Sequence, residues 1–182
     1  SHMPELQTDR LILRRMRLSD ARDMYDYASR PEVTRYLLWS PHPDIYHTED
    51  YLRYIATRYA TGSFYDWAVI LKKSDRMIGT CGFTAFHCNH DCAEVGYVLN
   101  PEYWGKGIAR EALLRVMEFG FSELKLHRIE ARFIEGNVAS LRVMQKVGMT
   151  FEGYQRDRLL VKGVHRTIGC CSILAGEWVK QE

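Results

Sequence analysis

The stretch that decides the fold reads Glu94-Val-Gly-Tyr-Val-Leu-Asn-Pro-Glu-Tyr-Trp-Gly-Lys-Gly-Ile-Ala-Arg-Glu111. Its apolar run from Val95 to Leu99 predicts a buried strand, and Pro101 ends that strand because proline has no N–H group for a ladder. A helical pattern begins at Ile108. The sequence therefore predicts a strand, a glycine-containing turn and a helix in direct succession.

Two glycines, Gly105 and Gly107, flank Lys106 immediately before this helix. The first N–H groups of a helix have no partner within it, and the helix dipole places partial positive charge there. Because glycine has no Cβ, an anion can approach the backbone of such a turn closely. We therefore predict that this loop binds a phosphate group.

Three kinds of phosphate-binding loop contain glycines of this type. The P-loop needs four residues between its glycines and a Lys-Ser/Thr pair after them, and neither is present. The dinucleotide-binding pattern Gly-x-Gly-x-x-Gly fails at its third glycine, where the chain has Arg110. The remaining candidate is the pyrophosphate loop of an acyl-CoA enzyme.

Residues 104–109 resemble the Gln/Arg-x-x-Gly-x-Gly/Ala loop of the GCN5-related N-acetyltransferase (GNAT) superfamily, with Trp104 at the Gln/Arg position. Three motifs resemble its ribosomal-protein N-acetyltransferase branch, in that family's order: Thr8-Asp-Arg-Leu-Ile-Leu-Arg14, Asn100-Pro-Glu-Tyr-Trp-Gly-Lys-Gly107 and Asn137-x-x-Ser-x-x-Val-Met-x-Lys-x-Gly-Met149. The resemblance implies transfer of acetyl from acetyl-CoA to a primary amine, with the N-terminal α-amino group of a ribosomal protein as the expected acceptor. A small amine (a polyamine, an amino acid or an antibiotic) is the first alternative, and a non-catalytic acyl-CoA-binding module is the second.

Length and composition fit this interpretation. The chain has 182 residues, of which 46% are apolar and 26% charged, values typical of one globular domain. A net charge of +2 predicts no binding to bulk nucleic acid or to a membrane surface. Ser1-His2-Met3 resembles an affinity-tag remnant, so we assign residues 4–182 to the domain. Five cysteines without framework spacing favour reduced thiols and a cytoplasmic protein; a homodimer is compatible with the resemblance.

One cluster contains residue types that bind zinc: His87, Cys88, His90 and Cys92. Zinc ligands usually come in two separated halves, and no second half is visible. The alternative is a polar turn between strands at residues 81–86 and 93–99. We expect the turn, and no metal.

Hydrophobic periodicity and cap residues predict the other elements. Strands are expected at residues 10–16, 67–71, 77–86, 94–99 and 129–134, with two more between 151 and 174. Helices are expected from 19 to about 28, from 48 to about 60, from 108 to about 124, and between Asn137 and Gly148. Residues 31–46 should form an irregular connection. Glu111 and Arg115, four residues apart, should form an ion pair on their helix. Several hairpins favour a mixed α/β fold with a mostly antiparallel sheet of about seven strands flanked by helices.

The resemblance assigns the acetyl-CoA site. The pantetheine arm would pair with the backbone of Tyr97, Val98 and Leu99 by strand addition, and an N–H group there could stabilise the thioester oxygen. The pyrophosphate would lie against the N–H groups of the loop and the first helical turn, namely Gly105, Lys106, Gly107, Ile108, Ala109 and Arg110.

The second part of the site begins at Asn137, which caps a helix and in the family also binds the pantetheine arm. Many members have a tyrosine seven residues later that protonates the leaving thiolate. Here that position is Met144, which has no proton to give. Ser140 lies one turn earlier, at the positive end of the helix, so we assign Ser140 as the hydrogen-bond donor to the thiolate.

Glu94 is the candidate general base, acting through water, and the alternative is an exposed glutamate at a strand end. Its rivals are Glu135, Glu130, His127 and His87. Aromatic residues in the variable segments are expected to contact the acceptor, namely Tyr36, Trp39, Phe83 and Tyr154.

Overall fold

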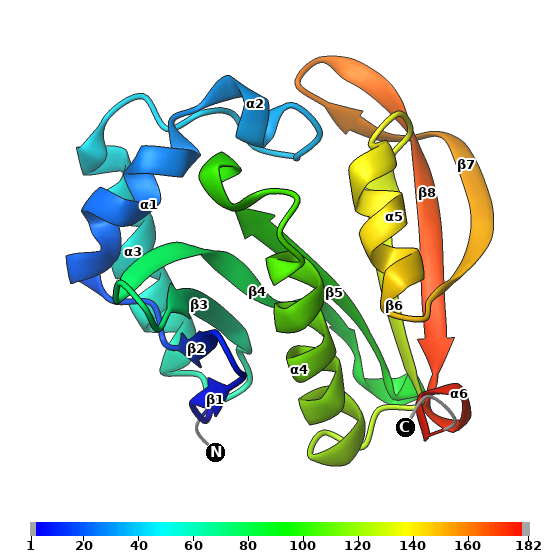
Figure 1. The fold of residues 1–182 in the computed structure, drawn as a ribbon. Coiled ribbons are helices and arrows are strands. Elements are labelled where there is room, and N and C mark those ends of the chain that lie inside the picture. Colours follow the sequence, from blue (N-terminus) through cyan, green and yellow to red (C-terminus); the bar gives the residue numbers. More distant parts are fainter. Residues whose placement is uncertain (1–2, 180–182) are drawn as a thin grey trace.

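The structure is a computed structural model, and it describes residues 3–179. Within that range eight strands form one sheet in the order β1-β2-β3-β4-β5-β6-β8-β7 (Figure 1). The strands are β1 (Leu6–Gln7), β2 (Leu11–Arg14), β3 (Asp66–Leu71), β4 (Arg76–His87), β5 (Cys92–Leu99), β6 (Arg128–Ile134), β7 (Thr150–Val161) and β8 (Val164–Leu174). β5 and β6 are parallel and the other neighbours are antiparallel, which confirms the predicted fold class. The additional strand is β1, whose two residues are too few for an alternating pattern.

Helices cover both faces of the sheet. The α-helices are α1 (Ala21–Ala28), α2 (Pro31–Thr34), α3 (Ile45–Tyr59), α4 (Ile108–Ser122), α5 (Val138–Lys146) and α6 (Ala175–Val179), and short 3₁₀ helices are η1 (Leu18–Asp20), η2 (Cys88–His90) and η3 (Pro101–Tyr103). Figure 1 shows α4 in front of the sheet and α3 behind it. Successive strand residues therefore meet different helices: Trp67 packs on Phe119 of α4, with ring centroids 5.4 Å apart, whereas the preceding residue, Asp66, accepts the hydroxyl of Tyr59 of α3 at its carbonyl.

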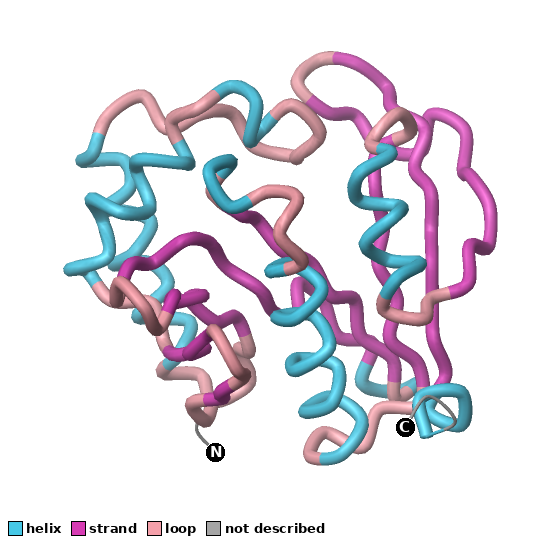
Figure 2. The backbone as a smooth tube through the Cα atoms, viewed as in Figure 1, coloured by secondary structure: helices cyan, strands magenta, loops and turns pink. Residues whose placement is uncertain are grey.

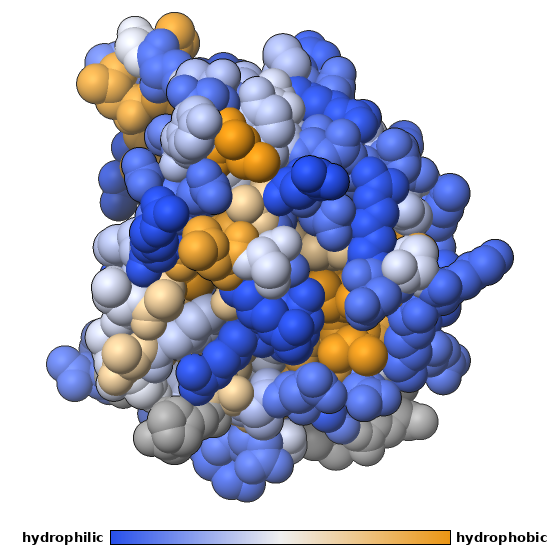
Figure 3. Space-filling model, turned by 90° about the vertical axis from the view of Figure 1, so that its left-hand side faces the viewer, coloured by the Kyte–Doolittle hydropathy of each residue, from blue (hydrophilic) through white to orange (hydrophobic). Residues whose placement is uncertain are grey.

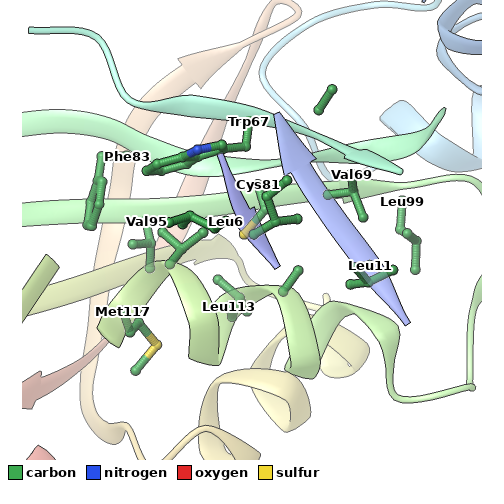
Figure 4. Close-up of a cluster of buried hydrophobic side chains, with 14 of the residues drawn as sticks. Leu6, Leu11, Trp67, Val69, Cys81, Phe83, Val95, Leu99, Leu113 and Met117 are labelled. Carbon is green, nitrogen blue, oxygen red and sulfur yellow. The ribbon is translucent and has the colours of Figure 1, made fainter. Parts of the chain in front are cut away.

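The main core lies between α4 and the central strands. Leu113 and Met117 of α4 belong to one core cluster with Trp67, Cys81 and Val95 of the sheet, and all five side chains are almost completely buried (Figure 4). The apolar residues of α4 recur at helical spacing, as the sequence predicts, so one face of the helix packs on the sheet. This packing fixes the position of the helix N-terminus, where the glycine loop arrives.

Most predicted elements agree with the structure to within two residues, but α3 begins at Ile45 rather than at Thr48. Its N-cap is Asp44, whose carboxylate accepts the N–H of His47 at 2.9 Å. Thr48 is instead completely buried, and its hydroxyl lies 2.7 Å from Nδ1 of His42. The sequence pattern therefore placed the helix start at Thr48, although the Thr48 hydroxyl is buried and does not cap the helix. The structure also contains a C-terminal helix, α6, that the sequence pattern did not predict.

The predicted ion pair between Glu111 and Arg115 is wrong. Glu111 instead pairs with Arg10, whose Nε lies 2.7 Å from the Glu111 carboxylate. Arg115 turns away to Glu118, with nitrogen and oxygen 3.8 Å apart. Nε and the backbone N–H of Arg10 bind the two carboxylate oxygens of Glu111, so a residue from another element satisfies this carboxylate in place of a neighbour on the same helix.

Residues 31–46 form the expected irregular connection. Apart from α2 and the first residues of α3, this segment is drawn as loop in Figure 2. No helix within residues 3–179 is long and apolar enough to cross a membrane. On the face in Figure 3, hydrophobic side chains gather in separate areas surrounded by hydrophilic ones.

The cluster at residues 87–92 is a turn between β4 and β5, and η2 forms its centre. Cys92 is buried in β5, and Nε2 of His87 lies 3.9 Å from the carboxylate of Glu130. Among the side chains that the structure describes, which do not include that of Cys88, no group of three or more His, Cys, Asp or Glu residues is arranged to hold a metal ion.

Candidate active site

The site begins where two neighbouring strands separate. In the described chain, β5 and β6 pair only through Cys92, Ala93 and Glu94, which are matched with residues 128–130. After Glu94, β5 continues to pair with β4 on its other side, and β6 continues to pair with β8. The facing edges of β5 and β6 therefore carry unpaired backbone N–H and C=O groups. Such an edge can bind an extended amide chain by strand addition, as the resemblance predicts for pantetheine.

A cavity of about 860 Å³ fills this gap and reaches both faces of the sheet. Its walls include residues 95–98 of β5 and residues 131–134 of β6. On one face the cavity is lined by residues of α4 and of the start and body of α5, namely Leu113, Asn137, Ser140 and Met144. On the other face it is lined by residues of α1, of α3 and of the connection before α3, namely Met24, Tyr27, Tyr36, Trp39, His42, His47 and Tyr51. Two ligands can therefore enter from opposite faces and meet between the strands. We call the two parts the thioester half (the side of α4 and α5) and the acceptor half (the side of α1 and α3).

The N-terminus of α5 brings Asn137 and Ser140 to the thioester half. The Asn137 side chain caps the helix, because its Oδ1 accepts the N–H of Ser140 at 3.2 Å. The Ser140 side chain forms a hydrogen bond with the side chain of Tyr97, which comes from β5. Burial raises the pKa of Tyr97, and the bond to Ser140 acts against this shift. Two hydroxyl groups therefore lie together at the end of α5, beside the buried thioether of Met144.

The side chain of Tyr97 is a site residue that sequence reasoning missed. Only its backbone was expected to take part, because the strand pattern placed Tyr97 in the core. Alternation along β5 directs Val95 and Tyr97 toward the same face, but the sequence does not show that α5 starts there. Val98 lines the cavity, whereas Leu99 is buried in the core.

The glycine loop joins β5 to α4, and both of its glycines have left-handed backbone conformations. Gly105 and Gly107 have φ angles of 73° and 75°, in the left-handed region that other residues rarely adopt, and Gly107 is the N-cap of α4. A Cβ on Gly105 would meet nothing within 4 Å. The first N–H groups of α4, from Ile108 onward, have no partner within the helix, and a ligand beside the loop could bind them.

The N-terminal motif supports this loop from the side. Nη1 of Arg10 donates to the carbonyl of Lys106 at 2.9 Å, while Nε binds Glu111 in the first turn of α4. Thr8 also donates a hydrogen bond to Glu111. Burial acts to raise the pKa of Glu111, but the hydrogen bonds from Thr8 and Arg10 outweigh it and lower that pKa. The first and second sequence motifs therefore form one structural unit, which the sequence did not predict.

Trp104 also has a structural role. Its indole Nε1 donates to the carbonyl of Leu99 at 2.8 Å, which ties the loop to the end of β5, while 48% of the residue remains exposed. An indole cannot bind phosphate as a guanidinium does. Positive charge near the loop comes instead from Lys106, Arg110 and Arg10.

Two carboxylates line the acceptor half, and their surroundings differ. The Glu94 side chain is only 16% exposed, so it is not the exposed strand-end glutamate of the alternative interpretation. Its Oε1 accepts Nε of Arg132 at 2.8 Å, and the Thr84 hydroxyl lies 3.3 Å from its other oxygen. Asp66, at the start of β3, has no ion pair within residues 3–179, and burial raises its pKa to about 7 against a hydrogen bond from the N–H of Trp67.

The other predicted residues divide between the cavity and the core. Tyr36 and Trp39 line the acceptor half, and their contact with the acceptor stays a prediction. Phe83 does not line this cavity in the described part of the chain: it is 3% exposed and packs under α4, where Gly120 leaves room for its ring. Tyr154 lies outside the described cavity lining and packs against Phe133, with ring centroids 6.0 Å apart. Of the four rivals of Glu94, none lines the cavity in the described part of the chain.

Comparison with known proteins agrees with this geometry. Residues 10–150 match the model of the acetyltransferase (GNAT) domain family. The chain is 36% identical to the N-acetyltransferase p20 of Bacillus licheniformis over 176 residues, which cover 97% of this chain and 99% of that protein. It is 27% identical to the [ribosomal protein uS5]-alanine N-acetyltransferase of Escherichia coli, with 98% of this chain and 95% of that protein covered.

Solved structures share the fold. A GNAT-family acetyltransferase from Bacillus anthracis superposes with a TM-score of 0.85 at 28% identity, covering 95% of this chain and 99% of the other. A spermidine N-acetyltransferase from Vibrio cholerae, in complex with CoA and spermine, superposes with a TM-score of 0.79 over 94% of this chain and 99% of the other, but at 20% identity its likeness concerns the fold alone. Together with the divided strands, the glycine loop and the capped α5, the family match establishes that this chain is an N-acetyltransferase and belongs to the GNAT family.

Proposed function

We propose that this enzyme transfers acetyl from acetyl-CoA to the N-terminal α-amino group of a protein, with a ribosomal protein as the expected class of acceptor. The observation that carries the proposal is the acceptor half of the cavity. It is lined by aromatic rings, and the carboxylate of Glu94 is already paired with Arg132. A polyamine carries several cations, which require several unpaired carboxylates, whereas a peptide N-terminus brings one amine beside apolar side chains.

The histidines of the acceptor half fit a weakly charged ligand as well. Burial lowers the pKa of His42 to about 4, helped by the neighbouring His47, so the His42 ring is neutral at neutral pH. Its Nδ1 is engaged with the buried hydroxyl of Thr48. A wall lined by aromatic rings suits the side chains that follow an N-terminal amine.

The residues of the thioester half suit acetyl-CoA. The unpaired edge of β5 would hold the amide groups of pantetheine, and the loop at residues 105–110 would hold the pyrophosphate. An N–H group of β5 that points into the gap can donate to the thioester oxygen as negative charge develops there. Both features belong to the folded chain itself, so little ordering is needed when the ligand binds.

The leaving thiolate needs a proton donor, and we assign this role to Ser140. Its hydroxyl lies at the positive end of α5, where negative charge is stabilised. The hydroxyl of Tyr97 is bonded to it and can hold it in position and supply a second donor. This pair compensates for Met144, which stands where many family members have tyrosine.

Glu94 differs from a free general base, because Arg132 occupies one of its oxygens. We propose that this ion pair positions the acceptor, with Glu94 attracting the amine and Arg132 available to an acceptor carbonyl. In this role the Glu94→Gln variant should raise the KM of the acceptor more than it lowers kcat. A loss in kcat that is partly restored at high pH would instead make Glu94 the proton acceptor.

The acceptor class is tested by an acetylation screen. Short peptides with different N-terminal residues, including those of ribosomal proteins, are compared with spermidine, amino acids and aminoglycosides. Release of the CoA thiol reports turnover, and mass spectrometry locates the acetyl group. The proposal expects the highest kcat/KM on a peptide α-amine, and a peptide whose N-terminus is blocked should be inactive. Turnover restricted to small amines would contradict it.

A further inference from the structure

A row of three residues crosses the floor of the acceptor half. Asp66 of β3 pairs with Gly82 of β4, and Gly82 pairs with Gly96 of β5. Directly opposed residues on antiparallel strands share one face, so these three side-chain positions lie side by side. Gly96 lies at the edge of the gap between β5 and β6. Because two of the three are glycines, no side chain of this row separates the Asp66 carboxylate from the gap.

Glycine is required at the middle of this row. A Cβ on Gly82 would lie 2.7 Å from Oδ1 of Asp66 and 2.4 Å from the carbonyl oxygen of Tyr65. The carboxylate therefore extends over Gly82, toward β5. Neighbouring strands are about 4.8 Å apart, so an amine above Gly96 lies within reach of Asp66 through one water molecule.

The groups that face Asp66 do not compensate its charge. They are Tyr27 from α1 and Tyr51 and Tyr59 from α3. Burial raises the pKa of each of these groups, so all three are neutral at neutral pH. His42 and His47 line the same half of the cavity, where the His42 ring is also neutral. The Asp66 carboxylate thus contrasts with Glu94, whose charge is balanced by Arg132.

Such a carboxyl group has the properties of a base for amine chemistry. Burial raises the pKa of Asp66 to about 7, close to neutral pH, and a base with such a pKa can both take up and release a proton there. The residue also has a fixed position, since the Tyr59 hydroxyl donates to its carbonyl at 2.6 Å.

We propose that Asp66 accepts the proton of the acceptor ammonium across the floor formed by Gly82 and Gly96. This inference rests on the proposed transfer to an amine, and it applies to a peptide or a small amine alike. The R–NH₃⁺ group gives one proton, through water, to the Asp66 carboxylate. The free nitrogen lone pair then forms a bond to the thioester carbon, and the C–S bond breaks. The second N–H proton goes to the thiolate, by way of Ser140, and Asp66 returns its proton to water.

The first test compares the pH dependence of kcat/KM in three proteins: the wild type, Asp66→Asn and Asp50→Asn. Asp50 is a matched control, since it pairs with Arg53 on α3 and its side chain is 79% exposed. At neutral pH, Asp66→Asn should lose about 10²-fold to 10⁴-fold in kcat/KM for the acceptor, with partial recovery toward pH 9. Its affinity for acetyl-CoA and the profile of Asp50→Asn should stay at wild-type values.

The assay uses whichever amine the wild type acetylates best. Activity restricted to small amines would contradict the peptide acceptor but leave the comparison intact. A wild-type profile in Asp66→Asn between about pH 6 and pH 9 would overturn the assignment of Asp66 alone. Carbon-13 NMR of the aspartate carboxyl groups gives a readout without turnover: one resonance should titrate near neutral pH and be missing from Asp66→Asn. If every carboxyl resonance titrates in the ordinary range of aspartate, the proposal is equally overturned.

A second variant tests the floor. A Cβ on Gly96 would meet the methyl group of Thr84 at 3.3 Å, a contact that the Thr84 side chain can relieve. Gly96→Ala should therefore fold and yet place a methyl group between Asp66 and the gap. Its kcat/KM for the acceptor should fall at least about tenfold while its melting temperature stays near that of the wild type. Unchanged kcat/KM in this variant would show that the proton does not cross the floor.

Discussion

At the scale of single residues, the two hydroxyl groups of Ser140 and Tyr97 decide how the thiolate leaves. Ser140→Ala removes the donor closest to the helix end, so kcat should fall by about 10²-fold while the affinity for acetyl-CoA stays within a few-fold of the wild type. Tyr97→Phe keeps the ring and removes only its hydroxyl, and should cost less. Single-turnover kinetics and calorimetry with CoA measure the two quantities. Ser122→Ala, on the far end of α4, is the control.

An unchanged single-turnover rate in Ser140→Ala would contradict this assignment, provided that chemistry limits the rate. If kcat falls as much in Tyr97→Phe as in Ser140→Ala, the Tyr97 hydroxyl would instead be the proton donor, and Ser140 would hold it in position. Because the two hydroxyls share a hydrogen bond, the variant that carries both Ser140→Ala and Tyr97→Phe should lose less transition-state stabilisation than the two single variants lose together.

Asp66 also gives the protein a pH-dependent stability. Its pKa rises from 3.8 in a model peptide to about 7 in the folded state, so the folded chain binds this proton more tightly than the unfolded chain does. The free energy of unfolding should therefore fall as the pH rises from about 4 to about 7 and stay level above that range. Asp66→Asn removes this loss and should be more stable than the wild type at pH 8, by up to about 4 kcal/mol.

The difference should shrink toward zero near pH 4, where Asp66 is protonated in the folded state and about half protonated in the unfolded chain. Urea unfolding at the two pH values measures it, with Asp50→Asn as the variant that should behave like the wild type. An equal difference between Asp66→Asn and the wild type at both pH values would contradict the raised pKa. A residue that lowers stability at working pH is expected where function, rather than packing, requires the charge.

Residue types alone predicted part of the site. Asn137 and Ser140 have the spacing of an N-cap residue and the residue whose N–H group it accepts. Tyr36 and Trp39 lie in a connection that the sequence predicted to be irregular. Asp66 and the Tyr97 side chain gave no signal in the sequence, because an aspartate before a strand and a tyrosine within one are ordinary. Their roles depend on the register among β3, β4 and β5, which brings two glycines into line beside Asp66.

At the scale of elements, the glycine loop and the start of α4 carry the anion site. Gly107→Val would force a β-branched residue into a left-handed conformation and place its side chain toward Arg10, 3.6 Å from the Cβ position. We expect the affinity for CoA to fall at least about tenfold, by calorimetry, with the secondary structure retained. The loss of affinity should be smaller for pantetheine, because pantetheine lacks the pyrophosphate.

Gly163→Val is the matched control, because Gly163 has a φ of 81° in the turn between β7 and β8. It carries a similar conformational strain far from the loop, so any general loss of stability should appear in both variants. Wild-type affinity for CoA in a folded Gly107→Val variant would exclude this loop as the pyrophosphate site.

The elements themselves were largely predictable, since periodicity and caps are local properties of the chain. The exceptions have local causes. Thr48 resembled a helix cap but is buried against His42, and β1 has too few residues for a pattern. The support that Arg10 gives to Glu111 was not predictable, because about a hundred residues separate them in the sequence.

At the scale of the whole molecule, the site exists because the sheet divides. The pattern of strands and helices predicts a mixed sheet, but not which two strands run parallel or where their pairing stops. That depends on how α4 and α5 pack on either side of the gap, which no single motif encodes. The resemblance to the GNAT family supplied the expectation, and the end of pairing after Glu94 provides the physical basis for it.

The central claim is that acetyl-CoA binds along the unpaired edge of β5, and hydrogen–deuterium exchange tests it most directly. Backbone amides at residues 95–99 are followed by NMR with and without acetyl-CoA. Those that point into the gap should exchange more slowly once the ligand is bound, because pantetheine becomes their hydrogen-bond partner. Amides already paired with β4 should change little. If acetyl-CoA binds, as calorimetry would show, while exchange at residues 95–99 stays unchanged and another part of the molecule becomes protected, the account is wrong.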